Sequence, residues 1–152
     1  MAYTTAEARG ELLEAVAQAA AELAFAGTAL TEAYDQLDEQ SGDRLEAELF
    51  RPVQLASGRA QRAETEFAAR HNLDPLAREQ GSTGLPSQGA AGFVGRAAEA
   101  VAEADRVLAE LQDSMLPVEA GDEQLRSALR AVREPLTGLP EKARAFLGGV
   151  GR

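Results

Sequence analysis

The chain has 152 residues and carries 25 acidic and 15 basic side chains, so its formal net charge is −10. This length suits a single domain that buries most of its apolar surface. The absence of cysteine excludes a disulfide scaffold, a thiolate metal site and a cysteine nucleophile. The single histidine excludes a metal site built from several imidazoles. The acidic balance argues against a protein that binds nucleic acid or an anionic membrane surface without regard to sequence.

Alanine and leucine dominate the composition, with 32 and 19 copies, while isoleucine is missing and lysine occurs once. This bias indicates a bacterial genome of high GC content. The N-terminus lacks the basic run and the apolar core of a secretory signal. The most apolar stretch, Ala15 to Leu30, is too short and too rich in alanine to span a membrane. We therefore expect a cytoplasmic protein with no membrane contact.

The first predicted helix covers about residues 5–40. Thr4 followed by Glu7 matches the capping box that starts many helices. Apolar or small residues then recur every three or four positions and predict one buried stripe: Leu13, Val16, Ala20, Leu23, Gly27, Leu30, Tyr34 and Leu37. The segment from Gln40 to Asp43 is a short connection of the kind that joins antiparallel neighbours.

The second predicted helix covers about residues 43–72 and has a similar stripe, which ends at His71. Pro52 lies inside this helix. Because proline has no N–H and its ring clashes with the preceding turn, we expect a kink near Phe50 and Arg51.

The rest of the chain predicts two further helices. Pro135 and Pro140 interrupt the last one. The expected segments are a helical turn at 74–80, a loop at 81–89, helices at about 90–115 and 122–147, and a disordered tail at 148–152. Strand-like alternation is absent, and four amphipathic helices must bury their stripes against one another. The sequence therefore predicts a single all-α domain, 1–147, folded as an antiparallel four-helix bundle.

The motifs of known catalytic and cofactor sites are missing. A di-iron bundle needs two Glu-x-x-His pairs, and His71 lacks even one such glutamate. His71 with Met115 is the one haem-ligand pair that remains, and the simpler interpretation is a histidine that caps a helix end. We therefore expect no catalytic residues, no cofactor and no metal centre. The acidic cluster from Asp35 to Glu48 leaves open whether a cation binds there.

Charge is concentrated in the first hairpin, because residues 1–50 hold 11 acidic and 2 basic side chains. The simpler interpretation is that Arg59, Arg62 and Arg70 of the second helix pair with acids of the first. The alternative is an acidic face that receives a basic protein partner.

One face of the first helix does not fit a simple monomer. On a helical wheel Phe25 lies opposite the buried stripe and is flanked by small residues. We therefore expect a homodimer interface formed by Ala17, Ala21, Phe25 and Thr28, with Leu55 as a second candidate contact.

The segment around Pro52 is a candidate ligand slot, because bundles sometimes hold ligands at kinks. Tyr34, Arg51 and Gln54 are expected to line its opening. The sequence thus favours a non-enzymatic bundle that acts through protein–protein contacts and self-associates. The alternative is a small-molecule or lipid carrier with an apolar slot between its helices.

Overall fold

The computed structural model describes residues 4–76 and 78–150, and in these residues the chain is helical with no strand. The all-α expectation is confirmed. In chain order the elements are α1 (Thr5–Asp35), α2 (Glu39–Leu45), the π-helical turn η1 (Glu46–Phe50), α3 (Arg51–Arg70), the 3₁₀ turn η2 (Pro86–Gln88), α4 (Gly89–Asp113), α5 (Leu116–Glu119), α6 (Glu123–Arg133), the 3₁₀ turn η3 (Glu134–Leu136) and α7 (Leu139–Val150).

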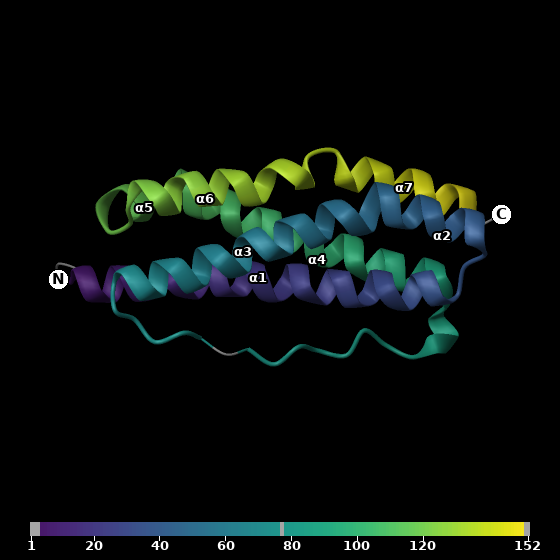
Figure 1. The fold of residues 1–152 in the computed structure, drawn as a ribbon, viewed down its shortest axis with the longest axis horizontal. Helices are drawn as coiled ribbons and strands as arrows, with labels where there is room; N and C mark the ends of the chain where they lie inside the picture. Colours follow the sequence, from purple (N-terminus) through teal and green to yellow (C-terminus); the bar gives the residue numbers. More distant parts are fainter. Residues whose placement is uncertain (1–3, 77, 151–152) are drawn as a thin grey trace.

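Four long rods lie side by side (Figure 1). The first is α1, the second is α2 with η1 and α3, the third is α4, and the fourth is α6 with η3 and α7. Helix α1 packs on both α3 and α4, α3 packs on α6, and α4 packs on α7. Each of these packed pairs runs in opposite directions, whereas α3 and α4 run the same way (Figure 1).

Helix α1 makes the most extensive contacts with both the second and the third rod. It starts at the predicted cap, where the Thr4 hydroxyl accepts the N–H of Glu7 at 3.1 Å. Four alanines on its inner side are completely buried: Ala19, Ala26, Ala29 and Ala33. Because alanine side chains are short, they let neighbouring helix backbones approach closely.

The first break in the chain comes earlier than predicted. Helix α1 ends at Asp35, and Asp38 starts α2 by accepting the N–H of Ser41 at 2.8 Å. Aspartate is among the best N-caps, so the chain restarts a helix at Asp38 instead of continuing the first one to residue 40.

The structure shows how the second rod accommodates Pro52. The five residues before α3 form η1, in which the N–H of Arg51 donates to the carbonyl of Glu46, one residue further back than in an α-helix. A wider turn moves the preceding carbonyls away from the proline ring, and it does not need the backbone N–H that Pro52 lacks. The expected kink thus coincides with a π turn at Glu46–Phe50, and the bend itself stays a prediction.

The connection between α3 and α4 differs most from expectation. The predicted helical turn at 74–80 is wrong, because residues 73–76 and 78–85, which we call the strap, contain no helix. The strap runs along the outside of α1 for the length of the molecule (Figure 1). Since α3 and α4 point the same way, the chain must return along a whole rod. A fully extended segment of 13 residues reaches about 43 Å, which is enough to span the length of the 25-residue helix α4, about 37 Å.

The fourth rod is interrupted where its prolines suggested. Helix α6 gives way to η3 at Glu134, and α7 begins after Gly138, which has a φ of +76°. The predicted tail at 148–152 is helical as far as Val150, and residues 151–152 lie outside the described residues. None of the helices in the described ranges combines the length and apolar character that crossing a bilayer requires.

Gly138 provides a test of the fourth rod. A Cβ at Gly138 would meet no atom within 4 Å, so Gly138→Ala changes only the backbone preference. A positive φ disfavours an L-residue, and we expect the free energy of unfolding to fall by about 1 kcal/mol. Gly10→Ala is the matched control, because Gly10 lies in α1 and also has open space, and there alanine should raise stability by about 0.5–1 kcal/mol. Urea unfolding of both variants measures the change in the free energy of unfolding. If both substitutions raise it, or both lower it, the left-handed conformation assigned to Gly138 is contradicted.

Candidate functional site

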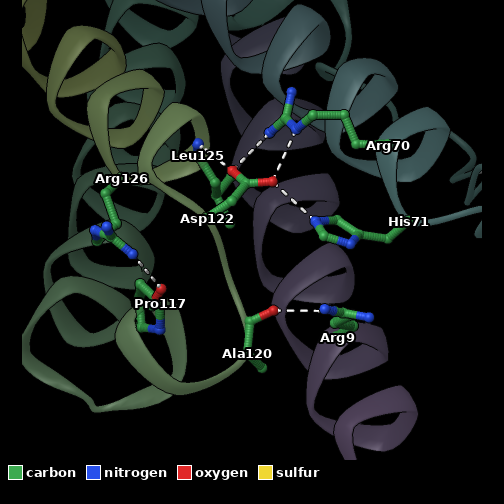
Figure 2. A network of polar contacts seen from close by, with 8 residues as sticks. All are labelled: Arg9, Arg70, His71, Pro117, Ala120, Asp122, Leu125 and Arg126. Atoms are coloured by element: carbon green, nitrogen blue, oxygen red, sulfur yellow. Dashed lines mark hydrogen bonds and ion pairs between the residues drawn. The ribbon is translucent and has the colours of Figure 1, made fainter.

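A network of polar contacts surrounds Asp122 at the end of the molecule near the N-terminus (Figure 2). Arg70 donates two hydrogen bonds to the Asp122 carboxylate, at 2.8 and 2.9 Å. Nε2 of His71 lies 2.8 Å from the same carboxylate. The backbone N–H of Leu125 donates to it at 2.7 Å, which makes Asp122 the N-cap of α6. One carboxylate therefore joins the end of α3 to the start of α6.

The chain brings these groups together through local turn chemistry. Helix α3 ends at Arg70, and Asn72 follows with a φ of +56°, a left-handed conformation that asparagine tolerates well and that often ends helices. Beside this contact, Nε of Arg9 on α1 donates to the carbonyl of Ala120 at 3.1 Å (Figure 2). Three rods thus meet at this end of the molecule.

The electrostatics of Asp122 favour its charged form. Partial burial opposes ionisation and raises the pKa of the carboxyl group. The hydrogen bonds from Arg70, from the N–H of Leu125 and from His71 outweigh burial and hold the pKa well below its usual range.

The groups of this cluster do not assemble a known catalytic or haem site. A histidine paired with an aspartate resembles part of a nucleophilic triad, but no serine or threonine hydroxyl in the described ranges hydrogen-bonds to His71. The ring of His71 packs on Phe67 with centroids 4.6 Å apart. Met115, the other haem-ligand candidate, is 59% exposed, while Nε2 of His71 is occupied by Asp122. The cluster acts as a clasp between helices.

Two arginines of the second rod, Arg59 and Arg70, contact the fourth rod and not the first. Arg59 donates to the carbonyl of Ala131 at 2.7 Å, and Arg70 binds Asp122. Arg62 forms no ion pair with another described residue. The expectation that these arginines neutralise acids of the first helix is therefore wrong. The sequence could not reveal this, because α3 packs on both α1 and α6, and the spacing of its arginines does not show which of these two neighbours they face.

A second arginine contact joins α6 to α4. Arg133 binds the carboxylate of Asp105 at 2.8 Å and the side-chain oxygen of Gln112 at 2.7 Å. The hydrogen bond from Arg133 to Asp105 raises the pKa of the guanidinium group. A hollow of about 680 Å³ opens beside this pair, at the α6–α7 interruption. Arg106, which also lines it, is paired with Glu103 and Glu110.

The predicted dimer interface on α1 is divided between buried and exposed positions. Ala17 is buried, and Ala21 and Phe25 are half-buried, which places Ala17 beyond the reach of a partner. Thr28 is exposed on α1, and Leu55 is 46% exposed on α3. The interface of these five residues stays a prediction, from which the buried Ala17 is removed.

Arg96 links the surroundings of Phe25 to the strap. The guanidinium carbon of Arg96 lies 5.9 Å from the centroid of the Phe25 ring, and the same arginine donates to the carbonyl of Ser82 in the strap at 3.4 Å. Farther along, Arg78 of the strap lies 3.7 Å from Glu14 of α1. The apolar face that the helical wheel assigns to a second copy thus lies beside this chain's own crossover.

The predicted ligand slot is partly assembled. Tyr34 lines a hollow of about 310 Å³ beside η1, whose other residues are Thr31, Leu45, Glu46 and Phe50. Gln54 lines an adjoining groove of about 420 Å³ between α1 and α3, together with Leu23, Ala24, Gly27, Thr28, Thr31, Phe50, Ser57, Gly58 and Gln61. Arg51 lines neither, and its side chain is 70% exposed.

The acidic cluster at the first turn forms an open hollow of about 480 Å³ lined by Asp38, Glu39, Gln40 and Asp43. Within residues 4–76 and 78–150, no three acidic or histidine side chains form a group that could hold a metal ion. The carboxylate of Asp38 is also used as the cap of α2.

The clasp at Asp122 makes a measurable contribution to stability. Asp122→Ala should lower the free energy of unfolding by about 2–3 kcal/mol, because it removes an N-cap and leaves partly buried Arg70 without its partner. Asp38→Ala is the matched control, an exposed N-cap without an ion pair, and should cost about 1 kcal/mol. Chemical denaturation measures both, and equal losses would show that Arg70 and His71 add nothing to the cap.

The same clasp predicts a pH dependence. Asp122 has a lowered pKa in the folded protein, so the unfolded chain takes up its proton at higher pH. Its stabilisation is therefore complete above the ordinary aspartate pKa and is lost as pH falls towards the folded value. Asp122→Asn keeps a capping oxygen but lacks the charge. The stability gap between wild type and Asp122→Asn should narrow as pH falls below about 4, and a gap independent of pH would contradict this.

No family model, curated protein or solved structure matches this chain. The groove, the hollows and the clasp at Asp122 are therefore the features from which a function can be inferred.

Proposed function

We propose that this chain is a non-enzymatic helical protein that acts through contact with other protein chains, and that its principal partner is a second copy of itself. In this proposal the four rods form an antiparallel four-helix bundle, kinked near Pro52 and broken between Pro135 and Pro140. A cytoplasmic location and the absence of nucleic-acid binding stay predictions of the composition.

The groove between α1 and α3 is the observation that carries this proposal. Its ten lining residues include no charged side chain, although 26% of the chain is charged. Six of these residues belong to residues 1–50, the part of the chain where acids most outnumber bases. An uncharged groove on a strongly charged surface is typical of an interface core surrounded by a polar rim.

The shape of the groove suits a helix. Small residues line it on both sides, with Ala24 and Gly27 on α1 and Ser57 and Gly58 on α3. A Cβ at Gly27 would meet no atom within 4 Å, so this part of the groove is open. Small side chains permit a third helix backbone to approach closely, and the distance between packed helices depends on the side chains at the contact.

This surface replaces the one centred on Phe25. Thr28 is the residue of the predicted interface that also lines the groove. Leu55 is exposed on α3 but does not line it. A basic partner on the acidic first hairpin stays the alternative, because Asp38, Glu39 and Asp43 line an open hollow there.

A second candidate function is the binding of a small molecule in the hollow beside η1. The specific observation in its favour is that Tyr34 and Phe50 line this hollow together. Its volume of about 310 Å³ is at the lower end of the range of ligand sites. π-helical turns are also frequent at functional sites.

Gly27 provides the test of self-association. We expect the wild type to have a solution mass of twice 16.0 kDa, and Gly27→Leu to shift the protein towards the monomer. The Cβ of the leucine would meet no atom within 4 Å in the folded chain, and its side chain would occupy the groove that a second helix needs. Sedimentation equilibrium at several protein concentrations measures the change.

Gly10→Leu is the matched control, because Gly10 also lies on α1, has open space around it and is absent from the groove. It should leave the mass unchanged. A monomeric wild type, or an equal effect of both substitutions, would refute self-association through this groove.

A further inference from the structure

We propose that the hollow beside η1 binds the ammonium group of a small organic cation, such as a quaternary amine with a short apolar arm. This inference rests on the second candidate function, since it names the class of ligand for that hollow. The occupant is a free small molecule, and its charge and size follow from the residues that line the hollow.

Two aromatic rings from different rods line the hollow. Tyr34 comes from α1 and is 44% exposed, and Phe50 is the last residue of η1 and is half-buried. Tyr34 lies against Gly42, because a Cβ built there would be 3.1 Å from Cε2 of the ring. A larger residue at 42 would push the ring aside. Aromatic faces attract ammonium groups through the ring quadrupole, and several rings together form the usual site for quaternary amines.

A carboxylate completes the hollow. Glu46 lines it, and its nearest cation is the exposed Arg51, with a nitrogen 4.0 Å away. An ion pair at that distance between exposed side chains contributes little, so the carboxylate is available to a ligand. Within the first fifty residues 11 acids face 2 bases, and this local field favours a cation and repels an anion.

The floor of the hollow is apolar and depends on the π turn. Leu45 is buried at the end of α2, directly before the widened turn of η1. Glu46 and Phe50 are the first and last residues of this turn, which precedes Pro52 in the chain with only Arg51 between them. Carboxylate, two rings and an apolar floor together match the charged head and the apolar arm of a small amine.

The test compares two ligands of nearly equal shape. Choline carries a quaternary ammonium group, and 3,3-dimethylbutan-1-ol is its uncharged carbon analogue. Each is titrated into the full-length protein at constant ionic strength, with calorimetry and the shift of the ligand's methyl proton signals as readouts. Choline should bind with upfield-shifted methyl signals from the aromatic rings, and the neutral analogue should bind at least about tenfold more weakly.

Two substitutions on the same turn form a matched pair. Glu46 and Glu48 both belong to η1, and their side chains are 44% and 42% exposed, but Glu48 pairs with Arg44 and does not line the hollow. Glu46→Gln should raise the Kd for choline about fivefold, and Glu48→Gln should change it less than about twofold. Tyr34→Leu keeps apolar bulk without the π face and should raise the Kd about threefold.

The outcomes distinguish two claims: that the hollow binds a small molecule, and that this molecule is a cation. If the neutral analogue binds as tightly as choline, the hollow is a ligand site but the inference of a cation fails. If neither ligand binds at about 10 mM, both the cation and the ligand function in this hollow fail. Equal effects of Glu46→Gln and Glu48→Gln would mean that only the general negative field attracts the cation, which also overturns the assigned site.

Discussion

The close approach of α1 to two neighbouring rods is the constraint on which the structure depends. Helix α1 packs on α3 on one side and α4 on the other, and its inner surface is lined with fully buried alanines such as Ala26 and Ala29. Short side chains bury little apolar area each, so stability must come from many close contacts and few voids. Among the described residues, every buried side-chain polar atom has a hydrogen-bond partner, which such tight packing requires.

The arginines supply the directional contacts between helices that alanine side chains cannot make. Long side chains from α1, α3 and α6 reach carbonyls or carboxylates on other elements, as Arg9, Arg59 and Arg133 do. A guanidinium group presents several donors in a rigid plane, so one side chain can hold two acceptors. The most complete example is Asp122, where a helix cap and an ion pair share one carboxylate. Such contacts specify which rods are adjacent, a choice that a uniform alanine surface leaves open.

The sequence predicts local structure well and the arrangement of the rods poorly, for a physical reason. The cap at Thr4, the disturbance at Pro52 and the interruption before Pro140 depend on neighbouring residues, and each is visible in the chain. The direction of α4 depends on whether residues 73–85 turn back or cross the molecule. Either is compatible with a polar, glycine-containing segment, and the predicted turn at 74–80 failed for that reason. The helical wheel assigns Phe25 to a second copy because a wheel contains no information about a crossover.

The two proposed surfaces are not independent of each other. The groove between α1 and α3 and the hollow beside η1 share Thr31 and Phe50. A second helix in the groove would therefore contact one wall of the cation site. If its contact moves the Phe50 ring, ligand affinity and self-association must change each other by the same factor, because coupling between two binding equilibria is reciprocal. The π turn before Pro52 thus contributes Phe50 to both proposed sites. In this proposal the position of the Phe50 ring determines whether ligand binding and self-association compete with or assist each other.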